Sequence, residues 1–364
     1  MNARTRRLLG GLTLLALTLL VLESGLRLLV SQPGFLQLLA RDGDQGWGDA
    51  AWRLIWVNEL HPRRPEWERL VQHSPTRGWA LRPDLRDLAL GGGLVVSSNR
   101  RGLRGVRNHE EGRRPGGARI LAIGDSFMFG DEVANTESLP AQLELLLPGS
   151  EVINLGVPGY GHDQMLIALQ EEGLRYQPDV LLIGFVTGDM DRNLLGFRDY
   201  AKPRFELVDG SLSLQGSPVP TPETLRAQEF RRLKLLDLVA MASHRARWPA
   251  DGRRERAERV TQAILDVIVA TAKDSGAVPV FLYMPVGAEI ALGAAGPSLG
   301  ELFLRGYCRE LGLLQVSAAG ALKPEPMAPM GGPDRHWTAA QNRAAAEVTA
   351  ALLRSEGLAP GPAP

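Results

Sequence analysis

Three short motifs in the chain carry side chains or glycine backbone suited to acyl-ester chemistry. They are Gly-Asp-Ser at residues 124–126, GVPGYG at residues 156–161, and Asp334-x-His336. A serine hydroxyl is a poor nucleophile at its own pKa and needs an adjacent base, which a histidine held by a carboxylate supplies. The pattern therefore predicts Ser126 as a nucleophile, His336 as its base and Asp334 as the acid that orients His336.

Each motif also has a purely structural interpretation. Gly, Asp and Ser are favoured in turns for local reasons. Thr338 is a plausible N-cap for a helix that begins just after His336. The motifs are far apart in sequence, so the catalytic interpretation depends on the fold that brings them together.

The elements that must position these motifs alternate as in α/β proteins. Short apolar runs predict five buried strands, at residues 118–124, 151–156, 178–186, 278–285 and 313–317. Helical patterns occupy residues 138–147, 162–176, 302–311 and a C-terminal stretch striped by Ala345, Val348 and Leu352. Strands joined by helices form a parallel sheet, and ligands bind beyond the carboxyl ends of its strands. The three motifs follow the first, second and last strand, so we expect them to meet at one edge of the sheet.

With GDSFMFG, NLGVPGYG and PDRHWT, the chain resembles the SGNH/GDSL hydrolase family from Arg119 to about Leu353. The upstream NRRGLRG is similar to a segment of envelope-anchored members, and Asp-x-His-Trp to alginate O-acetyltransferase-like members. The resemblance implies a three-layer α/β/α sandwich with a flavodoxin-like five-stranded parallel sheet. It also implies that the backbone N–H groups of Ser126 and Gly159 stabilise the oxyanion.

The family has four conserved sequence blocks, and this chain departs from the third of them, which follows the third strand. Members usually carry an asparagine before an aspartate, and this chain has Gly188 before Asp189. Loss of one oxyanion donor lowers kcat by on the order of a hundred- to a thousandfold. Thr187 and Asn193 are the nearby candidates to replace the missing side chain. The departure leaves open an alternative, a catalytically degenerate SGNH-like protein that binds glycans or assembles a polysaccharide complex.

The N-terminus predicts a membrane helix. Arg4, Arg6 and Arg7 precede an uncharged apolar run, residues 8–22, and the helical pattern continues to Val30. No A-x-A cleavage site follows this run, which favours an uncleaved signal anchor over a cleaved signal peptide. The arginines should stay cytoplasmic, which makes the chain a single-pass inner-membrane protein with a periplasmic or extracellular catalytic domain.

The expected organisation is an anchor at residues 1–30, an extension at 31–117, a hydrolase-like domain at 118–356 and a disordered tail at 357–364. An insertion at about 197–258 interrupts that domain. Within it, residues 202–220 predict a β-hairpin that turns at Asp209-Gly210. Residues 225–259 predict a basic helical stretch. It presents a solvated face or, alternatively, binds an acidic glycan or a membrane surface.

The composition limits the partners. Lys and Arg total 41 and Asp and Glu total 41, so the net charge offers no case for nucleic-acid binding. The single cysteine, Cys308, excludes an internal disulfide and is expected to be a buried apolar residue. The sequence shows no metal-ligand spacing, GxGxxG or P-loop, so no metal or cofactor is expected. The expected partner is an ester-bearing small molecule or an acetylated polysaccharide.

Overall fold

The computed structural model divides the chain into two compact units. It describes residues 2–35, 38, 48–59, 64–90, 94–112, 116–247, 250–291, 296–323 and 336–360. The first unit comprises Met1–Arg64, Phe197–Ala201 and Pro220–Arg253, and the second comprises Pro65–Gly196, Lys202–Val219 and Arg254–Pro364. The expected extension and the expected insertion are therefore each divided between the two units.

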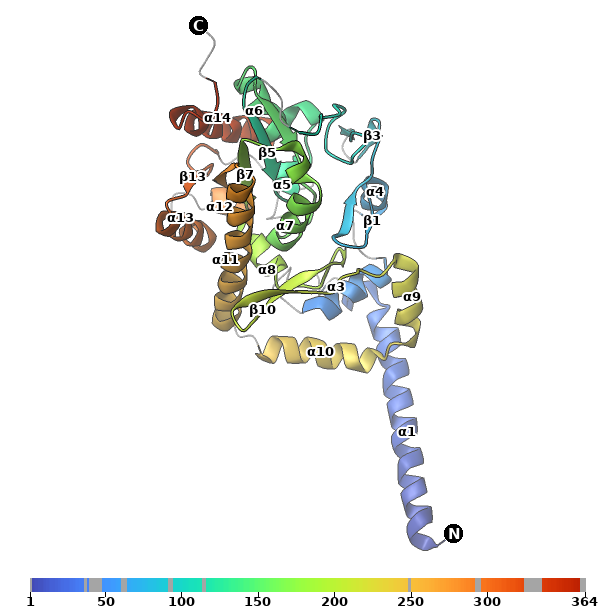
Figure 1. The fold of residues 1–364 in the computed structure, drawn as a ribbon. Coiled ribbons are helices and arrows are strands. Elements are labelled where there is room, and N and C mark those ends of the chain that lie inside the picture. The colour runs from blue at the N-terminus through green and yellow to red at the C-terminus, as the bar shows by residue number, and fades with distance from the viewer. Residues whose placement is uncertain are drawn as a thin grey trace. The chain divides into compact units, whose positions relative to one another are not determined.

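A five-stranded parallel sheet forms the centre of the second unit (Figure 1). Its strands are β5 (Arg119–Ile123), β6 (Glu151–Asn154), β7 (Val180–Phe185), β12 (Val278–Tyr283) and β13 (Leu314–Ser317). The order β13-β12-β7-β5-β6 is the flavodoxin-like order, in which β5 starts the sheet and later strands are added on both sides of it. The predicted fold class is confirmed, and the carboxyl ends of β5 and β7 form the switch point where ligands bind in such sheets.

Helices cover both faces of this sheet. They are α5 (Ser126–Phe129), α6 (Leu139–Leu146), α7 (His162–Glu171), α8 (Thr187–Arg192), α11 (Ala250–Asp274), α12 (Gly287–Ala291), α13 (Leu299–Leu311) and α14 (Ala339–Ser355), with 3-10 turns η3 (Asn135–Glu137) and η4 (Gly173–Tyr176). Ile120 and Leu182 point to one face and pack in a buried cluster with residues of α6 and α14, such as Leu143. Leu121 and Leu181 point to the other face and are equally buried, so both faces need cover, which gives the three layers.

Smaller elements complete the second unit. They are α4 (Arg64–Leu70), the antiparallel pairs β1 (Val71–Ser74) with β2 (Gly78–Leu81) and β3 (Leu88–Ala89) with β4 (Val95–Val96), and the hairpin β10 (Arg204–Val208) with β11 (Ser211–Gln215). The hairpin predicted within residues 202–220 is confirmed. Asp209 and Gly210 at its turn have φ values of 49° and 78°, as a two-residue hairpin turn requires.

The first unit is built on the N-terminal helix. Its elements are α1 (Ala3–Val30), α3 (Gly48–Val57), the short pair β8 (Phe197–Arg198) with β9 (Tyr200–Ala201), α9 (Pro222–Arg231) and α10 (Lys234–Arg247). From Arg4 to Val30, α1 is long and apolar enough to cross a membrane, and its side chains are almost all exposed. Only its last residues join a core, in which Val30 packs with Leu54 of α3 and Met241 of α10.

Candidate active site

Ser126 lies at the first position of α5, immediately beyond β5. Gly124 ends the strand, and a Cβ there would lie 2.4 Å from Cβ of Met128, so only glycine lets the helix start this close to the strand. Asp125 is the N-cap, and its carboxylate accepts from the backbone N–H of Phe127 at 2.9 Å. The turn that Gly-Asp-Ser forms therefore places the serine hydroxyl at the carboxyl end of the central strand.

The imidazole of His336 contacts the serine directly. Its Nε2 lies 2.8 Å from Oγ of Ser126, although 210 positions separate the two residues. The next residue fixes this arrangement, because the buried indole of Trp337 donates to the carbonyl of Pro285 at 2.9 Å. Thr338 then caps α14, as its position suggests, and the Phe127 ring packs 5.0 Å from the imidazole. Asp334 lies outside the described residues.

The other imidazole nitrogen faces two carboxylates from the loop after α5. Nδ1 of His336 lies 3.5 Å from Oε1 of Glu132 and 3.9 Å from Oδ2 of Asp131. Burial favours the neutral imidazole, but the charges of Glu132, Asp131 and Asp125 outweigh it and raise the pKa of His336. The loop therefore surrounds the histidine with negative charge that favours its protonated form.

The glycine-rich motif packs against the helix that begins at Ser126. A Cβ on Gly156 would lie 2.4 Å from the backbone nitrogen of Phe129, so the approach of loop to helix requires glycine. The Asn154 amide, at the end of β6, reinforces this contact by donating to the carbonyl of Met128 at 3.1 Å. Gly159 has φ +81°, a conformation that favours glycine. The motif thus holds a sharply turned, glycine-rich backbone beside the serine helix.

Gly188 is the second residue of α8, just beyond β7, and has no side chain that could donate to an oxyanion. A Cβ built there would meet nothing within 4 Å, so open space surrounds the position. Thr187 is occupied elsewhere, since its hydroxyl donates to Glu289 at 2.7 Å. The Asn193 amide is fully buried, and it donates to Thr261 at 2.8 Å and lies 3.2 Å from Nδ1 of His162. With these partners neither side chain is free to replace the missing asparagine, so we assign no oxyanion role to either.

Arg192 is a site residue that the sequence did not single out. Its Nη1 donates to Asp125 at 2.9 Å and to Asp189 at 2.6 Å, which links the serine turn to the helix that follows β7. The carboxylate of Asp125 that it binds lies 3.5 Å from Oγ of Ser126. A cation therefore stands close to the nucleophile. The i, i+3 spacing of Arg192 from Asp189 was the available signal in the sequence, and it could not reveal Asp125, the N-cap of α5, as the second partner.

Two residues upstream of the sheet brace the site, and sequence reasoning gave neither a role. The Trp79 indole donates to the carbonyl of Pro158 at 3.0 Å, and Tyr160 donates back to the Trp79 carbonyl at 2.6 Å, which holds the glycine-rich loop. Arg104, in the NRRGLRG segment, donates to the carbonyls of Gly130 at 2.7 Å and Val133 at 2.6 Å. Trp79 and Arg104 thus belong structurally to the site, although both precede the central sheet in the chain.

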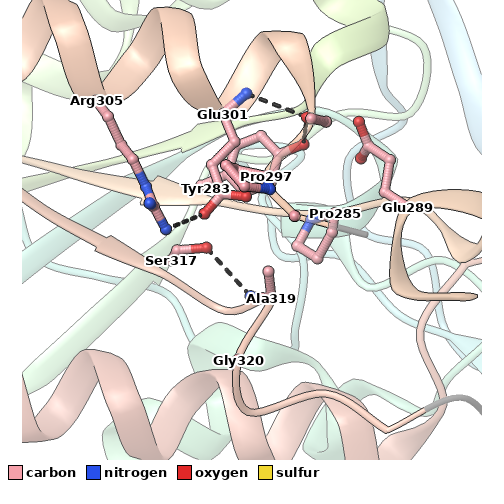
Figure 2. Close-up of a pocket in the computed structure, with 11 residues that line it drawn as sticks. Tyr283, Pro285, Glu289, Pro297, Glu301, Arg305, Ser317, Ala319 and Gly320 are labelled. Atoms are coloured by element: carbon pink, nitrogen blue, oxygen red, sulfur yellow. Dashed lines mark hydrogen bonds and ion pairs between the residues drawn. The ribbon is translucent and has the colours of Figure 1, made fainter. Parts of the chain in front are cut away.

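A cavity of about 580 Å³ opens where β12 and β13 end (Figure 2). Its polar lining includes Tyr283, Ser317 and the ion pair of Arg305 with Glu301, whose nitrogen and oxygen lie 2.7 Å apart. Pro285 also lines it, and the carbonyl of Pro285 is the one that anchors Trp337. The cavity therefore opens at the same edge of the sheet as Ser126 and His336.

No family model matches the chain, and no curated protein matches it. Similar solved structures include a lipolytic protein of the G-D-S-L family from Desulfitobacterium hafniense, 14% identical with a TM-score of 0.39, covering 65% of this chain and 99% of that one. Another is Est24, a carbohydrate acetylesterase from Sinorhizobium meliloti, 11% identical with a TM-score of 0.37, covering 66% of this chain and 99% of that one. A third is a two-domain esterase active on acetylated mannans, 14% identical with a TM-score of 0.38, covering 68% of this chain and 52% of that one. Likeness at this level does not identify the activity of this chain.

Proposed function

We propose that the chain is a membrane-anchored serine esterase or acyltransferase of SGNH type that acts on ester groups. The observation that carries the proposal is the 2.8 Å contact between Nε2 of His336 and Oγ of Ser126, at the switch point of the sheet. A histidine so placed takes the serine proton as Oγ attacks the ester carbonyl. Asp334 is proposed as the acid that orients the imidazole.

The reaction proceeds through an acyl-enzyme. Attack by Ser126 gives a tetrahedral oxyanion, for which the backbone N–H groups of Ser126 and Gly159 are the proposed donors. The intermediate expels the alcohol, which takes the proton from His336, and the acyl group stays on Oγ. Water, deprotonated by His336, then attacks the acyl-enzyme. The second tetrahedral intermediate expels Oγ of Ser126, which takes the proton back from His336, and the acid is released. In an acyltransferase, a hydroxyl group of the acceptor attacks in place of water.

The first experiment asks whether Ser126 is a nucleophile. The purified full chain is treated with a fluorophosphonate probe, and labelling is compared between wild type, Ser126→Ala and His336→Ala. We expect loss of labelling in the first variant and slow labelling in the second, because the hydroxyl loses its base. If Ser126→Ala is labelled to the same extent as wild type, the nucleophile is another residue.

Gly188 supports a second candidate, a degenerate SGNH-like protein that binds glycans or assembles a polysaccharide complex. Without an asparagine at this position, the oxyanion has one donor fewer than the family's pattern provides. Hydrolysis of p-nitrophenyl acetate that requires both Ser126 and His336 would exclude this candidate. Binding of an acetylated glycan without turnover would support it.

The proposed substrate is an O-acetyl ester of an envelope polysaccharide, and the cavity beyond β12 and β13 is the proposed site for its sugar. Its polar lining, with Ser317 and the charged pair Arg305–Glu301, suits hydroxyl groups. Ala319→Leu, which places bulk in this cavity, should raise KM for an acetylated oligosaccharide and leave p-nitrophenyl acetate hydrolysis unchanged. An equal effect on both substrates would contradict this placement.

The proposed anchor is α1, uncleaved, with Arg4, Arg6 and Arg7 in the cytoplasm. Burial of Val30, the last residue of α1, in a core with α3 and α10 supports retention of the helix, since cleavage beyond that residue would remove its side chain from the core. Intact-mass measurement of the chain extracted from membranes should give the full-length mass. A reporter that is active only in the periplasm, fused after Pro364, should give a signal. A silent fusion would indicate the opposite orientation of α1.

A further inference from the structure

We propose that α10, with the residues that lead into it, lies on the surface of the bilayer that α1 spans. Its apolar outer side would sit among the lipid headgroups and the first carbons of the acyl chains. This inference rests on the membrane-anchor part of the proposed function and adds a second, interfacial contact with the same membrane. It does not depend on the proposed esterase activity.

The outer side of this segment is apolar and exposed. Phe230, Leu233, Leu236 and Val239 are 83%, 50%, 56% and 54% exposed. They fall within ten consecutive residues, where a solvated helix would carry polar side chains. The opposite side of α10 is buried, through residues such as Met241. A helix with one buried side and one exposed apolar side has the character of an interfacial helix rather than a soluble one.

The start of α10 is attached to α1. The carboxylate of Glu23 accepts from the backbone N–H groups of Lys234 at 3.0 Å and Leu235 at 3.1 Å, so it caps the helix. Arg27 of α1 pairs with Glu23 at 2.8 Å and donates to the carbonyl of Arg232 at 3.0 Å. These polar contacts, from two charged residues of α1, fix where the segment meets the anchor.

That attachment lies at the level of the membrane surface. Glu23 is the first charged residue after the uncharged run at residues 8–22. A carboxylate is costly in hydrocarbon, so the end of this run marks where α1 enters the headgroup region. Because Glu23 caps α10, the N-terminus of α10 lies at the same depth.

The packing of α10 sets which side faces the bilayer. Met241 and Leu238 pack with Val30, seven residues beyond Glu23 along α1, and with Leu54 of α3. The buried side therefore faces the end of α1 that has left the membrane. The exposed side then faces back toward the membrane-spanning part, and α10 runs crosswise to α1 in this unit (Figure 1).

The charges of the segment suit phosphate headgroups. Its acidic residues between positions 229 and 247 are Glu229 and Asp237, both buried and both paired with Arg53. Arginines at both ends, Arg231 and Arg247 among them, are exposed. Outward charge is thus positive on both sides of an apolar face, the arrangement that binds an anionic lipid surface.

Nitroxide-lipid quenching in the full chain tests this inference. Leu236→Cys and Val239→Cys variants are labelled with an environment-sensitive fluorophore and reconstituted into vesicles of phosphatidylethanolamine and phosphatidylglycerol. A nitroxide placed near the headgroup should quench both labels by at least about twofold. Leu22→Cys is the positive control within α1, and Leu145→Cys, an exposed leucine of α6, is the matched control that should not be quenched.

The possible outcomes separate this inference from the anchor. Quenching at Leu22 without quenching at Leu236 and Val239 would overturn the interfacial helix and leave the anchor intact. No quenching at Leu22 would contradict the anchor itself. A blue-shifted label on α10 that lipid nitroxide does not quench would show that protein covers the face, either a second copy or another part of the chain, and would also overturn the inference.

Discussion

Nδ1 of His336 lies 3.5 Å from the carboxylate of Glu132, six residues beyond Ser126. His336 thus contacts Ser126 through Nε2, and the loop that follows Ser126 places a carboxylate next to Nδ1, the other ring nitrogen of His336. Asp131 adds a second carboxylate at 3.9 Å. This charge pattern is independent of Asp334 and makes the ionisation of His336 depend on the GDSFMFGDE segment itself.

We expect Glu132→Gln to lower the pKa of His336, because it removes a negative charge that favours the imidazolium. His336 must be neutral to accept the serine proton, so the rise of kcat/KM with pH should move to lower pH. The measurement is a pH profile of p-nitrophenyl acetate hydrolysis. Glu347→Gln, on the exposed side of α14, is the control, and a profile that stays in place in both variants would contradict the prediction.

Gly188→Asn should increase activity. The backbone there has no positive φ and a Cβ meets open space, so the side chain can be accommodated without strain. If its amide reaches the oxyanion, kcat gains up to the hundred- to thousandfold attributed to one such donor, roughly 3–4 kcal/mol. Gly188→Ala fills the same space without an amide and should not raise kcat. Equal kcat values for Gly188→Asn and wild type would show that an asparagine amide at this position does not stabilise the oxyanion.

The sequence predicts the sheet of this chain well because each strand is a short apolar run bounded by polar or glycine residues. All five predicted strands occur, and Ser126 follows the first of them as expected. Their parallel order follows from helical crossovers, so the convergence of Ser126 and His336 at one edge could be inferred before any coordinates. Asp334 remains a prediction from spacing alone.

The residues that brace the site could not be inferred in the same way. Arg104 and Trp79 act on loop carbonyls, and nothing in a side chain's type reveals which distant carbonyl it will meet. The ion pair of Arg192, in α8, with Asp125, the N-cap of α5, could not be inferred for the same reason. The division into two units was also hidden, since residues 31–64 and 220–253 pack together only through contacts far apart in sequence.

Cys308 should be inert in the native protein. It is 1% exposed on α13, and burial raises the pKa of its thiol to about 12, so almost no thiolate forms at neutral pH. We expect maleimide to label the native chain negligibly and the denatured chain fully, as measured by mass spectrometry. Rapid native labelling would contradict this burial and would require Cys308→Ser before any cysteine scanning of α10.

Arg104→Lys should weaken both stability and catalysis. The guanidinium donates to the carbonyls of Gly130 and Val133 and stacks 4.2 Å over the Phe129 ring. Burial lowers the pKa of Arg104 to about 10, which still leaves it charged at neutral pH. A lysine ammonium cannot make both bonds and the stack with the same planar geometry, so we expect a loss of about 2–4 kcal/mol in the free energy of unfolding.

The catalytic consequence of Arg104→Lys follows from what the clamped loop presents. Gly130 to Val133 carries the two carboxylates that face His336, so a loosened loop should lower kcat by on the order of tenfold while KM for p-nitrophenyl acetate changes little. Arg100→Lys, an exposed residue of the same segment, is the matched control and should leave unfolding and kcat unchanged. Loss of stability with wild-type kcat would assign Arg104 a purely structural role. If adding Glu132→Gln to Arg104→Lys lowers kcat no further than Arg104→Lys alone, both residues affect kcat through the same contact with His336.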